Sequence, residues 1–248
     1  MPQPPEHLPE STRGLLRAAV DTIGRVLSKN LRAVALVGPA ARPERPDRAR
    51  APELVVVVGD LDVSEVDQLG RALRPLTKQG LRVRLLTAEE LSTSTDVFTL
   101  EAAEWRAHHH LLFGEDPFAT LTWTQDDLRR SLETNARALR RRLRNRVLGG
   151  LARDPKGDEV SRAVVDAVDA LSIVIEHALL LAGRTAAGTE AARLTAFAEL
   201  VHADLSGLEA ITGQVRRGEH LDVLAALGTL DAALLAAVNW IDGWEASR

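Results

Sequence analysis

The sequence predicts an α+β protein in which a small domain with a mixed β-sheet precedes a bundle of α-helices. Up to about residue 120, stretches with helical spacing of apolar residues alternate with apolar segments of strand length. Beyond that point no strand pattern is found. The 248 residues, of which 45% are hydrophobic, suffice for two domains of ordinary size. We therefore expect a disordered lead at 1–10, a mixed α/β domain at 11–120 and a helical bundle domain at 121–248.

The expected α/β domain begins with a helix over residues 15–27, where apolar residues recur at helical spacing. The apolar segment 31–37 follows directly and predicts a first strand, and segment 54–58 predicts a second. Residues 64–67 resemble a capping box, which would open a helix that ends near Gly80.

Residues 81–86 alternate in polarity, which is typical of a strand in a half-solvated sheet. Leucine and valine occupy one face of this strand, and Arg82 and Arg84 lie on the other. A helix over 99–109 and a short strand at 111–113 complete the domain. The strands and helices therefore alternate along the chain, as expected for a small mixed sheet covered by helices.

The second half reads as a helical bundle. Thr124 and Asp127 can cap a long helix with a stripe of apolar residues at a period of 3.5 to 3.6 residues. Further helices are expected at 158–182, 189–207 and 221–245, and glycines punctuate the segments between them. Because the connections are short, neighbouring helices should run antiparallel.

Composition excludes several classes of function. The net charge of −4 gives no global attraction to nucleic acid or to anionic lipid, so such binding would need a local basic patch. The chain has no cysteine, which excludes disulfides, thiolate metal sites and cysteine nucleophiles. The N-terminus lacks the features of a signal peptide, and the most apolar stretch, 167–183, is interrupted by charged residues. We expect a cytoplasmic protein without membrane association.

One segment stands out between the first two strands. Gly38 ends the first strand, and Glu53 opens the second. The loop between them is rich in proline and also carries four arginines: Arg42, Arg45, Arg48 and Arg50. A long loop between two core strands is usually functional or derived from a functional segment.

This arrangement resembles the nucleotidyltransferase superfamily of the polymerase-beta type, including its minimal and antibiotic-modifying members. The family signature is a glycine followed by serine or glycine, a spacer, and an Asp-x-Asp or Asp-x-Glu that starts the next strand. In this chain Gly38 and Pro39 stand at the first pair, and Ala51 and Glu53 stand at the paired carboxylates. The segment 96–118, with its Gly-Glu-Asp-Pro turn, and the helical second half are also similar to the family.

The resemblance implies two magnesium ions, which carboxylates would hold against a nucleoside triphosphate. Ala51 offers no oxygen ligand, and Pro39 has neither the hydroxyl nor the N–H group of a phosphate-binding turn. The family's third carboxylate would fall on strand 81–86, where this chain has Arg82 and Arg84 on the solvent side instead of an acid. Glu53 alone cannot assemble a two-metal site, so we expect vestigial catalytic positions, no metal and no resident cofactor.

Our first hypothesis is therefore a catalytically degenerate nucleotidyltransferase-like protein that is not an enzyme and has a regulatory or protein-interaction role. Weak nucleotide or phosphate binding would involve Gly38, Arg42, Arg82 and Arg84. A homodimer or a protein partner is expected to engage the helical domain.

A first alternative is an active, magnesium-dependent nucleotidyltransferase that uses Glu53 together with Asp60 or Asp62. These two aspartates form an Asp-x-Asp pair just beyond the second strand. The simpler interpretation places both in a solvated turn at the positive end of the next helix, where aspartate is common.

A second alternative is a nucleic-acid-associated protein that acts through the arginine-rich helix 129–146, which holds eight arginines. Contacts to nucleic acid or to an acidic partner would come from four of them: Arg137, Arg140, Arg141 and Arg144. We favour instead an ordinary solvated helix face whose arginines pair with acids of neighbouring helices, because the whole chain is negatively charged.

Overall fold

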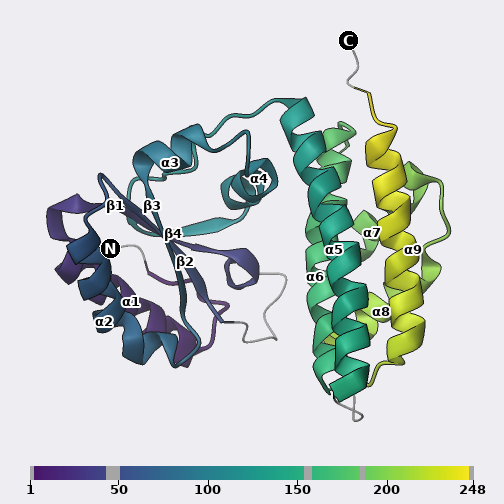
Figure 1. Cartoon of the computed structure of the whole chain (residues 1–248), viewed down its shortest axis with the longest axis horizontal. Coiled ribbons are helices and arrows are strands. Elements are labelled where there is room, and N and C mark those ends of the chain that lie inside the picture. The colour runs from purple at the N-terminus through teal and green to yellow at the C-terminus, as the bar shows by residue number, and fades with distance from the viewer. Residues whose placement is uncertain (1–2, 43–50, 154–157, 185–187, 246–248) are drawn as a thin grey trace. The chain divides into compact units, whose positions relative to one another are not determined.

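The chain forms two compact units, Met1–Trp123 and Thr124–Arg248, in a computed structural model. The division falls close to the boundary expected near residue 120. The structure describes residues 3–42, 51–153, 158–184 and 188–245. The predicted α+β class is confirmed, because a four-stranded sheet with helices precedes a purely helical unit (Figure 1).

The sheet of the first unit is mixed, with the strand order β3-β2-β1-β4. The central strand β1 runs antiparallel to both β2 and β4, whereas β3 runs parallel to β2. The strands are β1 (Leu31–Val37), β2 (Glu53–Val58), β3 (Arg82–Thr87) and β4 (His109–Gly114). Apart from Arg32 in β1 and Glu53 at the start of β2, the two inner strands are apolar and buried, because helices cover both faces of the sheet.

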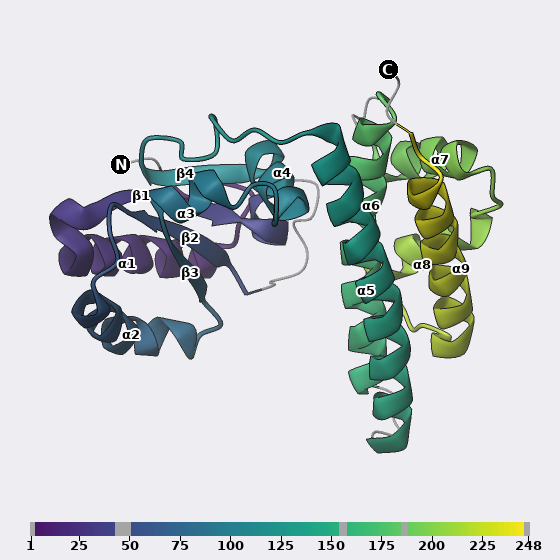
Figure 2. The same cartoon turned by 45° about the horizontal axis from the view of Figure 1, so that its top comes forward.

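Each face of this sheet belongs to its own apolar cluster. Leu54 and Val56 of β2 pack with the helices α1 and α2, whereas Val55 and Val57 pack with α3 and α4. Figure 2 shows these two pairs of helices on opposite sides of the strands. The helical segments are α1 (Glu10–Leu27), η1 (Ser28–Asn30), η2 (Gly38–Ala41), α2 (Val63–Thr77), α3 (Ala88–Thr93) and α4 (Thr99–Ala107).

The start of α2 differs from the prediction. The capping box expected at residues 64–67 does not form, and Asp62 is the N-cap residue instead, with its side chain accepting a hydrogen bond from the Ser64 N–H at 2.8 Å. Asp67 pairs with Arg71 one turn further along the helix. Asp62 is preferred because its side chain can reach the first free N–H groups of the helix.

The N-terminal segment, expected to be a disordered lead over 1–10, lies against the first unit from Gln3 onward. Pro4 and Pro5 are buried. The Nε2 atom of His7 lies 3.1 Å from the carbonyl oxygen of Ala40, and that of His110 lies 2.8 Å from the carbonyl oxygen of Gln3. These contacts order the segment, and α1 begins at Glu10.

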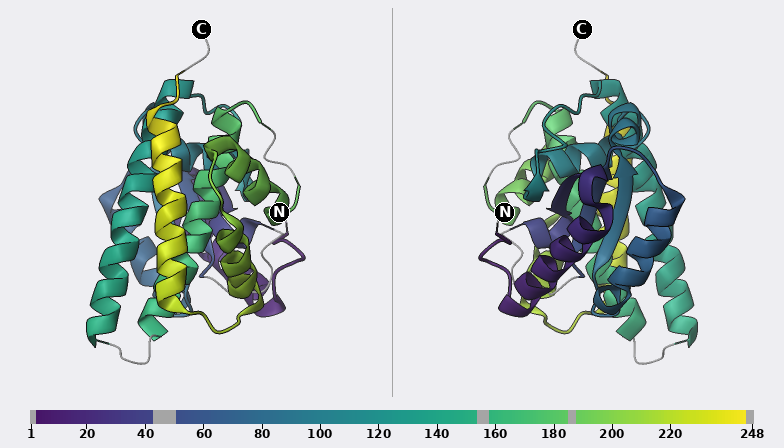
Figure 3. Two further views of the ribbon diagram at one scale, coloured as in Figure 1. Left: turned by 90° about the vertical axis from the view of Figure 1, so that its right-hand side faces the viewer. Right: turned by 90° about the vertical axis from the view of Figure 1, so that its left-hand side faces the viewer.

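The second unit contains five helices in its described part, in which α6 packs against the other four. These helices are α5 (Gln125–Arg153), α6 (Asp158–Leu181), α7 (Glu190–Val201), α8 (Ser206–Arg217) and α9 (Val223–Asp242). The last helix, α9, also packs on α5 (Figure 3). The cap predicted at Thr124 and Asp127 is confirmed, because each side chain accepts a hydrogen bond from the other residue's N–H at 3.1 Å.

Two features of this unit were not anticipated. The segment 189–207 was expected as one helix, but α7 ends at Val201, His202 adopts a left-handed conformation, and α8 starts only at Ser206. Among the described helices, α9 is long and apolar enough by composition to cross a membrane. Part of α9 is buried in the bundle, where Leu230, Leu234 and Ile241 have no exposed surface, whereas Leu224 and Leu235 are exposed.

Candidate functional site

The residues predicted for the site gather at one end of the central strands. Glu53 opens β2, where it pairs with Val37 of β1 on one side and with Arg82 of β3 on the other. Gly38 follows β1 directly and has a φ angle of +70°, a left-handed conformation that glycine adopts without strain. The structure therefore brings Gly38, Glu53 and Arg82 to the same edge of the sheet.

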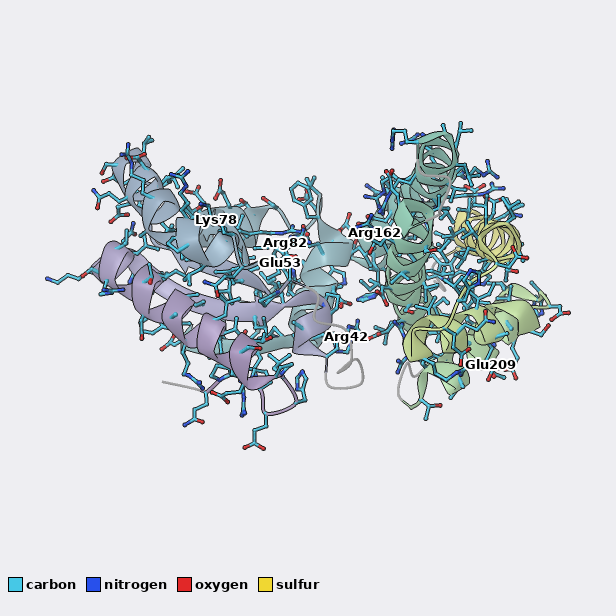
Figure 4. The ribbon with its side chains drawn as sticks, turned by 90° about the horizontal axis from the view of Figure 1, so that it is seen from below. Arg42, Glu53, Lys78, Arg82, Arg162 and Glu209 are labelled. Carbon is cyan, nitrogen blue, oxygen red and sulfur yellow. The ribbon has the colours of Figure 1, made fainter. Side chains whose placement is uncertain are left out.

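Glu53 lies within a network of ion pairs. Its carboxylate accepts a hydrogen bond from Arg84 Nε, and Arg84 Nη1 donates in turn to Glu101 on α4. Arg82 Nη2 lies 3.6 Å from the second carboxylate oxygen of Glu53. Figure 4 shows Arg82 and Glu53 side by side. The Glu53 side chain is only 12% exposed, so both of its oxygens face guanidinium groups rather than open solvent.

The Arg84 side chain is held firmly in this network. Burial alone would lower its pKa, but the carboxylates of Glu101 and Glu53 outweigh burial and raise the pKa above the ordinary arginine value. Its guanidinium carbon also lies 5.7 Å from the centre of the Trp105 ring, within the range of a cation–π contact. Arg84 is therefore a permanent cation on β3, the strand on which the family resemblance would place a third carboxylate.

This donor set does not fit magnesium. A two-metal site needs several oxygen ligands around each ion. Among the residues that the structure describes, no group of three histidine, aspartate or glutamate side chains could hold a metal. Ala51 is exposed and carries no oxygen in its side chain, and Pro39 lies in η2. A cation that approached Glu53 would have to displace Arg84.

Asp60 and Asp62 lie beyond the opposite end of β2 from Glu53. The strand rises about 3.3 Å per residue, which places its two ends roughly 17 Å apart. The carbonyl oxygen of Asp60 accepts a hydrogen bond from Asn30 at 2.9 Å, and Asp62 caps α2. Hydrogen bonds from Ser64 hold the pKa of Asp62 below its usual value. The structure thus separates Glu53 from Asp60 and Asp62, the other two carboxylates of the alternative metal site, which lie in the turn and the cap that lead into α2.

Arg42 was expected to bind phosphate, but its side chain is buried in an ion pair. Its side chain is 1% exposed and forms a two-pronged pair with Glu104 of α4, with Nε–Oε1 at 3.0 Å and Nη2–Oε2 at 2.7 Å. This pair ties the end of η2 to α4. The remaining arginines of the loop, Arg45, Arg48 and Arg50, lie outside the described residues.

The acids of α4 were missed by sequence reasoning. Glu101 and Glu104 are one helical turn apart and bind Arg84 and Arg42, respectively. A signal was present in the segment LEAAEW, where two glutamates three positions apart stand among apolar residues. An acid that is buried, as Glu104 is, requires a cationic partner, and arginine was the only abundant candidate.

Most arginines proposed for nucleic-acid contacts are engaged within the helical unit. Arg140 and Arg144 of α5 each form two hydrogen bonds with Asp231 of α9, at 2.9 Å for Arg140 and at 2.6 and 2.7 Å for Arg144. Arg137 Nε donates to Glu133 at 2.8 Å, and Arg141 is exposed. The geometry favours the interpretation of this helix face as one that pairs with neighbouring acids.

We expect Asp231→Asn to lower the free energy of unfolding by about 2 kcal/mol at neutral pH. Hydrogen bonds from Arg140 and Arg144 lower the pKa of Asp231 from 3.8 to about 2. A carboxyl whose pKa is depressed by folding stabilises the folded state above its unfolded pKa, and the stabilisation is lost as pH falls through the folded value. The difference between wild type and variant should therefore shrink in urea unfolding as the pH falls from about 4 towards about 2.

Asp242→Asn provides the matched control for this experiment. Asp242 lies on the same helix, is 63% exposed, and has its nearest contact with Arg137 at 3.7 Å. Its replacement should change the stability by less than about 0.5 kcal/mol. Equal effects of the two substitutions would show that Asp231 makes no special contribution.

Comparison with known proteins found a solved structure with a similar fold. No family model matches this chain, and no curated protein matches it by sequence. The solved structure of the spectinomycin adenyltransferase AAD(9) from Enterococcus faecialis, with ATP and spectinomycin, superimposes with a TM-score of 0.56 at 15% sequence identity. The match covers 90% of this chain and 98% of that one. It shows a nucleotidyltransferase-like fold followed by a helical domain, which confirms the fold expected from residues 31–58 and 96–118.

Proposed function

We propose that this protein is a non-catalytic protein with the nucleotidyltransferase fold, which acts in regulation or in protein interaction. The observation that carries this proposal is the position of Arg84. Its guanidinium group binds Glu53, the one carboxylate at the vestigial metal site, and links it to Glu101. We infer that this guanidinium group stands where an active enzyme would need a metal ion.

A guanidinium group cannot replace magnesium in phosphoryl or nucleotidyl transfer. A metal ion can bind the attacking and leaving oxygens at the same time and offers open coordination positions. Arginine donates hydrogen bonds in a fixed plane and stays protonated, so it neither activates a hydroxyl nor exchanges ligands. The network can bind an anion, but it supplies no route to transfer.

Weak binding of a phosphate group is compatible with the same geometry. Arg82 is 65% exposed and makes only a loose pair with Glu53, so its donors are accessible to a ligand. The neighbour AAD(9) was solved with ATP and spectinomycin. For this chain we expect nucleotide binding that is weak, independent of magnesium and dominated by Arg82.

The test is calorimetry with ATP in the presence and in the absence of magnesium, together with Glu53→Gln. Since the substitution removes a negative charge next to Arg82 and Arg84, we expect ATP to bind the variant at least as tightly as wild type. We also expect no transfer of AMP to spectinomycin in a mass-spectrometric assay. The control is Glu89→Gln, which removes the charge of an exposed glutamate on α3.

An active enzyme would give the opposite pattern. ATP binding would then require magnesium, and Glu53→Gln would abolish both the binding and the transfer of AMP. Either of these results would overturn the proposal of a non-catalytic protein.

A further inference from the structure

A cavity of about 310 Å³ lies in the first unit, where α3 and α4 approach β3 (Figure 1). Much of its lining is apolar and belongs to the protein core: Leu91 and Trp105 are each 8% exposed, and Ala102 is 4% exposed. This volume falls at the lower end of the range of small-molecule sites. The cavity is therefore large enough for a compact ligand with one or two rings.

The charged groups of the cavity are mainly acidic. Glu90 of α3 and Glu101 of α4 line it, and Arg84 is the single cation among its described lining residues. Arg84 also binds Glu53, which does not line the cavity, so its positive charge is shared between two carboxylates. The charge that a ligand meets is consequently negative, and the cavity should attract a cation.

An aromatic side chain stands at the edge of the same cavity. Phe98 lines it and yet is 58% exposed, although a large apolar side chain is normally buried. The main chain at Phe98 is held by a hydrogen bond from its N–H to the carbonyl oxygen of Ser94 at 2.9 Å. The cavity thus offers two aromatic side chains, Phe98 and Trp105, on segments that lie next to one another in the chain.

We propose that this cavity binds a small planar aromatic molecule that carries one positive charge. Its ring packs against Trp105 and Phe98, which favour offset or edge-on contacts with another ring. Its cationic group lies near Glu90 and Glu101, where it gains charge-assisted hydrogen bonds. This inference goes beyond the proposed function, since neither metal nor nucleotide is needed to form the site.

Calorimetry with three probes tests the proposal directly. The probes are 1-naphthylmethylamine, 1-naphthaleneacetate, which has the same ring and the opposite charge, and cyclohexylmethylamine, which keeps the amine and lacks the aromatic ring. We expect the first to bind about tenfold more tightly than either of the others. Equal affinity for the aromatic amine and the aromatic acid, or no binding of the aromatic amine, would overturn the proposal.

Two variants locate the binding in this cavity. Glu90→Gln removes one acid and retains the capping box with Thr87, because glutamine can also accept the hydrogen bond from the Thr87 N–H. We expect it to weaken the binding of 1-naphthylmethylamine about fivefold. Phe98→Ala should weaken it by a similar factor with little effect on folding, because this ring is largely exposed.

The matched control is Glu89→Gln, an exposed neighbour on the same helix that does not line the cavity. It should leave the affinity within about twofold of wild type. If Glu90→Gln and Phe98→Ala also left the affinity unchanged, the site would be elsewhere and the inference would fail. All titrations are made without nucleotide and magnesium, so their outcome is separate from the test of catalytic activity.

Discussion

Arg42→Met is expected to lower the free energy of unfolding by about 3–5 kcal/mol, the largest effect that we predict for a single substitution. Arg42 and Glu104 form a buried ion pair with side chains that are 1% and 8% exposed. Methionine fills a similar space, but it leaves the Glu104 carboxylate in an apolar environment without the guanidinium group. Urea unfolding monitored by circular dichroism measures the change.

Two further variants make this prediction specific. Arg82→Met changes an arginine that is 65% exposed and loosely paired, and it should cost less than about 1 kcal/mol. The double variant Arg42→Met, Glu104→Leu removes both charges and should recover a large part of the lost stability. A loss of less than about 1 kcal/mol in Arg42→Met alone would contradict a structural role for the pair.

The Arg42–Glu104 pair is one of the ion pairs that join the candidate site to α4. In the vestigial site, η2 and β3 each provide an arginine to α4, whose two glutamates lie one turn apart. The buried carboxylate of Glu104 needs Arg42 as its partner, whereas Glu101 is 34% exposed and depends less on Arg84.

Much of the fold was predictable because it depends on local patterns. The apolar runs of β1 and β2 and the helical spacing in α5 can be recognised in the sequence without knowledge of the tertiary contacts. The cap at Thr124 was also predictable, since it needs only residues three apart. The break between α7 and α8 was missed because no glycine or proline marks it, and His202 takes the left-handed conformation instead.

The candidate site was predictable in its positions and only partly in its contacts. The sequence pattern assigned Gly38 to the end of one strand, Glu53 to the start of the next and Arg82 to a third, and the pairing of these strands brings the three residues to one edge of the sheet. The partners on α4, Glu101 for Arg84 and Glu104 for Arg42, were not identified because they are distant in sequence from these arginines. Opposite charges far apart in a chain can pair in many ways, and only the packing of α4 on the sheet selects one.

In the helical unit, Arg216→Met is expected to lower the free energy of unfolding by about 3 kcal/mol at neutral pH. Arg216 of α8 donates to Asp169 of α6 at 2.5 Å and to Glu190 of α7 at 2.6 and 2.8 Å, so one side chain joins three helices. Burial would lower its pKa, but the hydrogen bonds to Glu190 and Asp169 outweigh it and raise the pKa. Without the guanidinium group, the two carboxylates lose their shared cation.

The pH dependence distinguishes this loss from a simple packing defect. Removal of the cation leaves the carboxylates of Asp169 and Glu190 without the guanidinium group, and protonation at low pH removes their charges and with them part of the destabilisation. The difference between wild type and Arg216→Met should therefore shrink as pH falls from about 7 to about 4. Arg217→Met is the matched control, because this next residue is 62% exposed and pairs only with Glu219 in the described part of the chain. A loss that stays constant with pH, or that equals the loss in Arg217→Met, would contradict the prediction.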